Sequence, residues 1–204
     1  NTIYGVTVDV NVNRAGFFGQ IDGATVRNLT LADGSVSNSA TGAAYYTGGI
    51  VGSANNGSSI ENCVNGLQVE GPTVGGIAGY INNSSITECV NEAPVTGTGT
   101  ASTAYAGGIC GNVSSGSEIT YCQNTEGIYG KSFAGGISGS LASNTVSKAC
   151  MNVGNVEASG GAKKQGSIVG KSSNGKILSC LSYVEGSDLF ITGTAGASDT
   201  YDGN

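Results

Sequence analysis

A short segment that recurs along the whole chain constrains its fold more than any other feature. The segment is Gly-Gly-Ile, one variable residue and a further Gly, and its four complete copies begin at Gly48, Gly75, Gly107 and Gly135. A fifth copy, at Gly166, has Ser in place of the second Gly. Successive Ile residues lie 27, 32, 28 and 31 positions apart. A period of this size is typical of a solenoid, in which each repeat is one structural unit and neighbouring units share a core.

A second motif follows the first at an almost fixed distance. It is an apolar residue followed by a Cys, which lies 12 or 13 positions after the Ile of the first motif. The Cys residues of this motif are Cys63, Cys89, Cys122, Cys150 and Cys180. An earlier copy has Phe17 in the Ile place and Leu29 in the Cys place. Constant spacing within a repeat and variable spacing between repeats predict a fixed cross-section from which loops of different length project.

The motifs are short, and no stretch has apolar residues at helical spacing over ten or more positions, so the repeats are predicted to be strands. Because the same strand recurs once per repeat, equivalent strands would stack in parallel, about 4.8 Å apart. We therefore predict an all-β fold, a single-stranded parallel β-helix that winds to the right, with about six coils of three short strands each.

The repeats indicate a single β-helix domain over residues 1–204. We expect a partial N-terminal coil at 1–15, in which Ile3, Val6 and Val8 match Val26, Leu29 and Leu31. The repeats proper span 16–186. Residues 187–204 would be a C-terminal cap or tail, in which Leu189 to Ile191 cover the last coil and 193–204 fray.

Three interior columns are predicted from residues that recur at one place in each coil. The Ile residues of the first motif would form one column and the Cys residues a second. Asn65, Asn91, Asn124 and Asn152, each two positions after a Cys, would form a hydrogen-bonded amide ladder. Buried thiols are favoured for the Cys column, and disulfides between neighbouring coils are the alternative for an exported protein. Cys110 lies outside this column and is expected to be more exposed.

The combination of Gly-Gly-Ile-x-Gly, a later Asn62-Cys63 pair, a turn and a Val resembles the GLUG repeat family, over about residues 16–186. The other copies depart from it at the residue before Cys, which is Glu88, Tyr121, Ala149 or Ser179. The resemblance implies a secreted or cell-surface bacterial protein of the kind found in Bacteroides and other gut anaerobes. It implies an adhesive or spacer role, sometimes beside a peptidase, and it supplies no catalytic residues.

Composition argues against several partners. The net charge is −6, from 8 basic and 14 acidic residues, which disfavours nucleic acid. The one basic cluster, Lys163, Lys164, Lys171 and Lys176, is interpreted as a solvated loop surface. The sequence has no run of 18 apolar residues, so membrane insertion is not expected. No signal peptide precedes the strand-like first residues. We expect part of a longer chain, extracellular or on a bacterial cell surface, from which the export signal has been removed.

The search for catalytic chemistry finds little. The chain has no His, which excludes Ser-His-Asp and Cys-His arrangements. The acids are scattered, and alignment on Cys places Glu61 opposite Thr87 rather than opposite Glu88. The segment Gly166–Ser172 is similar to a phosphate-binding loop, but the repeat explains it better. We predict no catalytic residue, no metal site and no cofactor.

The expected function is a non-catalytic interaction or adhesion module, or a spacer, whose variable outer loops bind an unknown protein or glycan. The candidate ligand-binding residues in or beside these loops are Tyr45, Tyr46, Tyr80, Tyr105 and Tyr129. Tyr offers a rigid contact surface that is apolar on its faces and polar at its tip, although ordinary loop packing also explains these residues. The alternative is a carbohydrate-active enzyme or a carbohydrate-binding part of one, which a cluster of acids on one face would favour.

Overall fold

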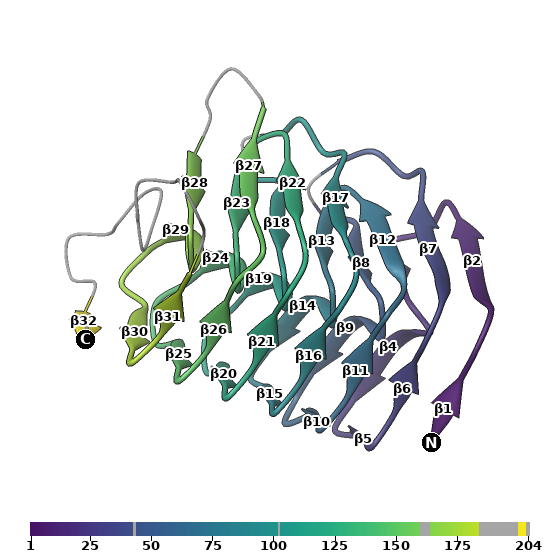
Figure 1. Cartoon of the computed structure of the whole chain (residues 1–204), viewed down its shortest axis with the longest axis horizontal. Helices are drawn as coiled ribbons and strands as arrows, with labels where there is room; N and C mark the ends of the chain where they lie inside the picture. The colour runs from purple at the N-terminus through teal and green to yellow at the C-terminus, as the bar shows by residue number, and fades with distance from the viewer. Residues whose placement is uncertain (43, 102, 160–163, 184–199, 203–204) are drawn as a thin grey trace.

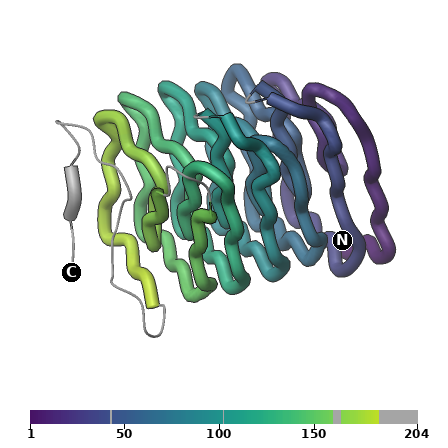
Figure 2. The backbone as a smooth tube through the Cα atoms, turned by 90° about the horizontal axis from the view of Figure 1, so that it is seen from above, coloured from purple at the N-terminus to yellow at the C-terminus, as the bar shows by residue number. Residues whose placement is uncertain are grey.

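The computed structural model describes residues 1–42, 44–101, 103–159, 164–183 and 200–202. These residues form a parallel β-solenoid in which five sheets run along the long axis (Figure 1). Each coil gives one strand to each sheet, and successive coils lie side by side from the N-terminal to the C-terminal end (Figure 2). The all-β parallel architecture is therefore as predicted.

Sheets A to E are named in the order in which the first coil contributes to them, and all strand pairs are parallel. Sheet A contains β1 (Thr2–Ile3), β6 (Thr30–Leu31), β11 (Val64–Asn65), β16 (Val90–Asn91), β21 (Gln123–Asn124), β26 (Met151–Asn152) and β31 (Leu181–Ser182). Sheet B contains β2 (Val6–Val10), β7 (Gly34–Asn38), β12 (Gln68–Gly71), β17 (Val95–Gly97), β22 (Ile128–Gly130) and β27 (Val156–Ala158).

Sheet C contains β3 (Arg14–Ala15), β8 (Tyr46–Gly48), β13 (Thr73–Gly75), β18 (Tyr105–Gly107), β23 (Phe133–Gly135) and β28 (Lys164–Gly166). Sheet D contains β4 (Phe18–Asp22), β9 (Val51–Asn55), β14 (Ala78–Asn82), β19 (Cys110–Val113), β24 (Ser138–Leu141) and β29 (Val169–Ser172). Sheet E contains β5 (Thr25–Arg27), β10 (Ser59–Glu61), β15 (Ser85–Thr87), β20 (Glu118–Thr120), β25 (Val146–Lys148), β30 (Lys176–Leu178) and β32 (Thr200–Asp202).

The strands make six coils, from β1–β5 to β26–β30, and β31 follows the last of them. The number of coils agrees with the prediction, but each coil has five strands rather than three. Both sequence motifs lie on corners. Ile50 is in the bend between β8 and β9, and Cys63 is in the bend between β10 and β11. Each extended piece that the sequence indicates is thus two strands joined by a buried corner.

The corner before each Cys requires a left-handed backbone. The preceding residue has a positive φ in every copy: Asn28 (56°), Asn62 (48°), Glu88 (54°), Tyr121 (55°), Ala149 (52°) and Ser179 (50°). Asn tolerates this conformation, whereas most L-residues adopt it at a cost of about 1 kcal/mol or more. The Asn of the Asn62-Cys63 pair therefore has a backbone role, and the copies that lack Asn there are strained.

The predicted amide ladder is present. Each of the first three Asn side chains donates one hydrogen bond to the next Asn, at 2.8 Å from Asn65 to Asn91, from Asn91 to Asn124 and from Asn124 to Asn152. The last, Asn152, donates to the backbone carbonyl of Ser167 at 3.0 Å. Every one of the four also bonds within its own turn, by donating to the backbone carbonyl two residues further on, as from Asn91 to Ala93 at 2.7 Å. All four side chains are fully buried. The ladder fixes the register between coils, because a shift would leave buried amides without partners.

The Ile and Cys columns are buried as predicted. Ile50, Ile77, Ile109 and Ile137 are fully buried, and Phe17 packs against the first of these coils. Cys110 is also fully buried, contrary to the expectation that it is more exposed. It lies on β19 between Ala78 and Ser138 in sheet D, where the corner covers the strand.

Both ends differ from the expectation. Ile3 pairs with Leu31 and Val8 with Val36, so the proposed match to Val26 and Leu29 is wrong. The proposed cap at Leu189–Ile191 lies outside the described residues. Thr200–Asp202, expected within a frayed tail, instead pairs with Lys176–Leu178 and extends sheet E.

Replacing Ala149 by Asn should stabilise the protein, because Ala149 has a left-handed φ of 52°. We expect a gain of about 1 kcal/mol in the free energy of unfolding, which corresponds to about 2–4 °C in Tm for a chain of this size. The reverse change, Asn62→Ala, should lower Tm in the same thermal melt. A neutral or destabilising Ala149→Asn would contradict the strain at this corner.

Replacing Asn91 by Ala should destabilise the ladder. The change removes the bond that Asn91 accepts from Asn65 and the two that it donates. The partners stay buried and unpaired, so we expect a loss of about 3 kcal/mol or more in urea unfolding. Glu92→Ala, at the exposed next residue, is the matched control and should be neutral. Equal effects of the two variants would show that the ladder contributes no stability.

Candidate ligand-binding surface

One outer position of sheet C carries large side chains in five of the six coils. It lies two residues before the first Gly of each repeat, and its members are in register along the axis. They are Arg14, Tyr46, Thr73, Tyr105, Phe133 and Lys164. Because the Gly pair forms the corner to sheet D, these side chains stand beside the bend between the two sheets.

Sheet D adds two side chains to this row. Tyr80 on β14 stacks on Tyr46, with ring centroids 4.6 Å apart and planes at 19°. Lys171 on β29 places its Nζ 5.9 Å from the ring centre of Tyr105 and 5.5 Å from that of Phe133. We call this surface the aromatic strip. Its members are Arg14, Tyr46, Tyr80, Tyr105, Phe133, Lys164 and Lys171.

The aromatic strip has a member in each of the six coils and contains two groups of rings and cations in contact. Arg14 lies over the Tyr46 ring, with Cζ 6.0 Å from its centre. Tyr105 and Phe133 pack with centroids 5.5 Å apart, and Nζ of Lys164 is 5.9 Å from the Phe133 ring centre. Rings in the second to fifth coils are thus flanked by cations in the first and sixth. Cation–π contacts at such distances are favourable and leave the cationic groups able to bind anions.

Most of the aromatic strip is half-buried, so its rings are held in place and still reachable. Tyr105 is the exception, at 7% exposed. Burial and the neighbouring Tyr80 raise the pKa of Tyr46, whereas Arg14 lowers it. The Nε of Arg14 is buried and has no hydrogen-bond partner within the described residues. A buried donor without a partner is unusual and destabilises the fold.

The charge of this surface is opposite to that of the whole chain. Among all strands of sheets C and D, which the structure describes completely, Asp22 is the one carboxylate, and Asn56 donates a hydrogen bond to it at 2.7 Å. The three cations of the aromatic strip form no ion pair within the described part of the chain. A chain of net charge −6 therefore presents one basic and aromatic surface.

The structure brings together three of the five Tyr residues that the sequence suggests, namely Tyr46, Tyr80 and Tyr105. Tyr45 is half-buried beside the loop that contains Gly42. Tyr129 is 44% exposed on sheet B, away from the aromatic strip. Sequence reasoning therefore grouped five residues of which two lie elsewhere.

Sequence reasoning missed Arg14, Phe133 and the cations Lys164 and Lys171 as members of one surface. Lys164 and Lys171 belong to the basic cluster interpreted as a solvated loop surface. The structure instead places them on strands β28 and β29, while Lys176 is on sheet E. The sequence did contain a signal for the sheet C part of this surface. Its members all lie two residues before the first Gly of their repeat: Arg14, Tyr46, Tyr105, Phe133 and Lys164.

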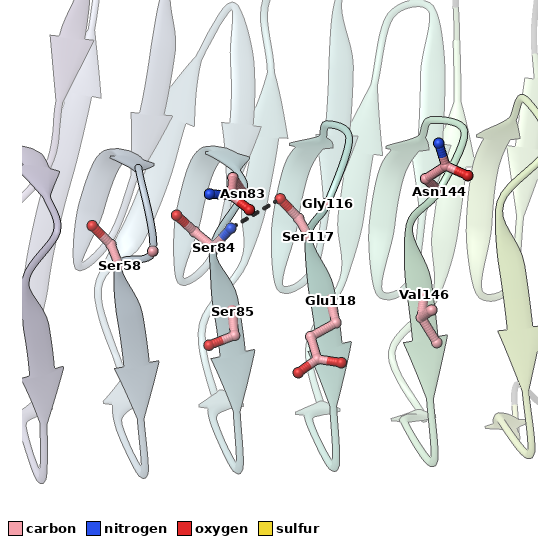
Figure 3. A pocket seen from close by; sticks show the side chains of 10 residues that line it. Ser58, Asn83, Ser84, Ser85, Gly116, Ser117, Glu118, Asn144 and Val146 are labelled. Carbon is pink, nitrogen blue, oxygen red and sulfur yellow. Dashed lines mark hydrogen bonds between the residues drawn. The ribbon is translucent and has the colours of Figure 1, made fainter.

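The larger grooves of the described residues lie outside the aromatic strip. The first, of about 340 Å³, runs over the turns into β15, β20 and β25 and is lined by Ser58, Ser84, Ser117 and Glu118 among others (Figure 3). Its hydroxyls are used within the turns, as where the backbone N–H of Ser84 donates to Oγ of Ser117 at 3.3 Å. The second, of about 360 Å³, lies between two outer loops and includes Glu70. In the described part of the chain, no hydroxyl group donates a hydrogen bond to Glu118 or to Glu70.

The cysteines are the most nucleophilic side chains of the chain, and the structure buries most of them. All six are free, and only Cys180 is partly exposed. The S–H hydrogen bond to Cys89 and burial raise the pKa of Cys63, and burial raises that of Cys110. Hydrogen bonds from Cys122 and Cys63 lower the pKa of Cys89. A thiolate formed there would still have no access to solvent, since Cys89 is fully buried.

Glu61 pairs with Thr87 and with Arg27 across sheet E, as the spacing from Cys predicts. The described residues contain no group of three or more Cys, Asp or Glu able to hold a metal ion. They also contain no helix long and apolar enough to cross a membrane.

Comparison with known proteins identifies the fold class. No family model and no curated protein matches the chain, so the resemblance to GLUG repeats stays a prediction. The structure is similar to a crystal structure from Bacteroides ovatus, of a protein provisionally named an immunoglobulin A1 protease. The TM-score is 0.77 and the identity 24%, over 100% of this chain and 66% of that one. The similarity shows a β-solenoid, and this chain spans less than two thirds of its neighbour.

The column thiols should resist alkylation in the folded protein, because access to them is blocked. With iodoacetamide under native conditions, we expect Cys180 to react and Cys63, Cys89, Cys110, Cys122 and Cys150 to stay unmodified. In denaturant all six should react, which peptide mass spectrometry resolves. Recovery of a Cys63–Cys89 disulfide, or native labelling of Cys110, would contradict the buried reduced column.

Proposed function

We propose that the chain is a non-catalytic binding module of an exported bacterial protein and that its ligand lies along the aromatic strip. The observation that carries the proposal is the surface from Arg14 to Lys171, in which four successive coils each contribute one ring. Fixed, half-exposed aromatic rings with nearby charged groups are the elements from which binding surfaces are built.

A rigid scaffold supports this role. The backbone under the rings is held by parallel ladders on both sides and by the buried amide column. Rings held in this way lose little conformational freedom when a ligand binds, which favours affinity. The outer loops, which the sequence suggested as the binding surface, approach the same surface through Tyr46 and Tyr105, which begin the strands after the loops. The aromatic strip and these loops thus form one side of the solenoid.

Catalysis is the weaker proposal. The name of the structural neighbour raises proteolysis, but the likeness at 24% identity extends to the fold alone. The chain has no His, its thiols are mostly buried, and Glu61 faces Thr87 and Arg27 rather than a second acid. An extracellular or cell-surface location is part of the proposal. It is supported by the Bacteroides source of the neighbour and by the resemblance of the repeats to GLUG proteins.

A glycan and glycoprotein array tests the binding role. We expect the wild-type chain to bind a subset of ligands and the double variant Tyr46→Leu, Tyr80→Leu to lose roughly tenfold or more in affinity, because both rings of the stacked pair are removed. Tyr129→Leu, which removes an exposed ring on sheet B, is the matched control. Equal binding by all three proteins would place the ligand elsewhere.

An activity assay tests the non-catalytic part. Human immunoglobulin A1 incubated with the purified chain should keep an intact heavy chain on a denaturing gel. A specific fragment that grows with the amount of protein, and that survives repurification of the protein, would overturn this part of the proposal.

A further inference from the structure

We propose that the aromatic strip binds an extended acidic oligosaccharide lying along the solenoid axis. The sugars would pack along the exposed edges of Tyr46, Tyr80 and Phe133. Their carboxylate or sulfate groups would pair with Arg14, Lys164 and Lys171. This inference rests on the proposed function, because it specifies the ligand class of the same surface.

The spacing of the rings fits a chain of sugars. Tyr46, Tyr80, Tyr105 and Phe133 belong to the second, third, fourth and fifth coils. Equivalent strands of neighbouring coils lie about 4.8 Å apart, which is close to the length of one pyranose unit in an extended oligosaccharide. A linear glycan parallel to the axis would therefore pass the half-buried rings of the second, third and fifth coils at successive sugars. The ring faces are covered by one another and by the cations, so the sugars would contact the exposed ring edges.

The charges specify an acidic ligand. Arg14 lies at the first coil, and Lys164 and Lys171 lie at the sixth. None of them has a carboxylate partner in the described residues, and Nε of Arg14 is buried without an acceptor. A neutral sugar would leave these three charges without a counter-ion, whereas a carboxylate or sulfate accepts strong hydrogen bonds from a guanidinium or an ammonium group.

Single-stranded nucleic acid fits this surface less well. Such ligands also stack bases on aromatic side chains, but they carry a phosphate on every nucleotide and are bound in a groove lined with cations. Here four of the seven members of the aromatic strip are rings, and only three cations serve its six coils. The net charge of −6 would repel a polyphosphate.

An extended peptide fits poorly as well. Peptides that bind sheets usually add a strand to a free edge. The strip lies on the faces of sheets C and D, where β8 to β24 are paired with neighbours on both sides. The backbone groups of these strands are therefore already used, and recognition must come from side chains.

The experiment uses calorimetric titration of the whole chain with defined oligosaccharides. The central comparison is hexagalacturonic acid against its fully methyl-esterified form, which has the same backbone without the charge. A chondroitin sulfate hexasaccharide separates sulfate from carboxylate recognition. Cellohexaose is a neutral reference, and a deoxythymidine hexanucleotide tests the nucleic-acid reading.

Three charge-removing variants accompany these ligands: Arg14→Gln, Lys164→Gln and Lys171→Gln. We expect at least one acidic hexasaccharide to bind at least tenfold more tightly than the neutral ones, and each variant to lose roughly tenfold. Binding should weaken as NaCl rises from 50 to 500 mM. Lys148→Gln and Lys176→Gln, exposed on sheet E, are the matched controls and should bind as the wild type does. Thermal melts confirm that every variant is folded.

Each other result has a defined meaning. Equal binding of acidic and neutral glycans, lost in Tyr46→Leu but unchanged in the cation variants, overturns the acidic ligand and leaves the binding role intact. Tighter binding of the oligonucleotide also overturns it. Acidic binding that the sheet E controls lose as fully as the strip variants shows non-specific attraction and overturns it. Binding of no probe here, and of no ligand on the array, overturns both proposals.

Discussion

The buried amide ladder is the interaction on which the remaining structure depends. A Cβ atom added to the second Gly of each complete repeat would lie 2.2 to 2.5 Å from a ladder side chain, as at Gly49 and Asn65. The glycine corner therefore rests directly on the ladder. The fifth repeat supports this coupling, because Ser167 replaces the Gly where Ser182 replaces the Asn. At the N-terminal end, Leu31 on β6 occupies the ladder position, and Phe17 lies at the corner between β3 and β4.

This coupling also positions the aromatic strip. Its sheet C members stand two residues before the first Gly of the corner, so the ladder fixes their height along the axis and the corner fixes their direction. Tyr46 can stack on Tyr80, one coil further on, because the corner brings sheets C and D close together. A destabilised corner would therefore alter binding as well as folding, which is why the proposed variants change outer side chains and leave the glycines in place.

The interior columns were predictable from the sequence because stacked coils pack best when equivalent positions carry the same residue type. An Ile, a Cys or an Asn packs best on the same residue one coil away, so each interior column repeats a residue type. The five-strand coil was not predictable from this pattern, because Ile50 and Cys63 are apolar and buried at bends just as they would be within strands. The left-handed residue before each Cys was hidden as well, since Asn62, Tyr121 and Ala149 share a conformation but no chemistry.

The candidate site was predictable only in part because outer positions need not match their neighbours. Arg14, Tyr46 and Phe133 occupy equivalent positions in their repeats, but the residue type at this position changes from coil to coil. The outer surface of sheet B differs in charge from the aromatic strip. The outer column of sheet B carries Asp9, Glu70 and Glu157 in one register, with Tyr129 among them. These acids belong to the first, third and sixth coils, so they do not form the cluster that would favour a carbohydrate-active enzyme. The solenoid nonetheless separates an acidic side from a basic, aromatic one. Such a separation orients an approaching anion toward the aromatic strip before any contact forms.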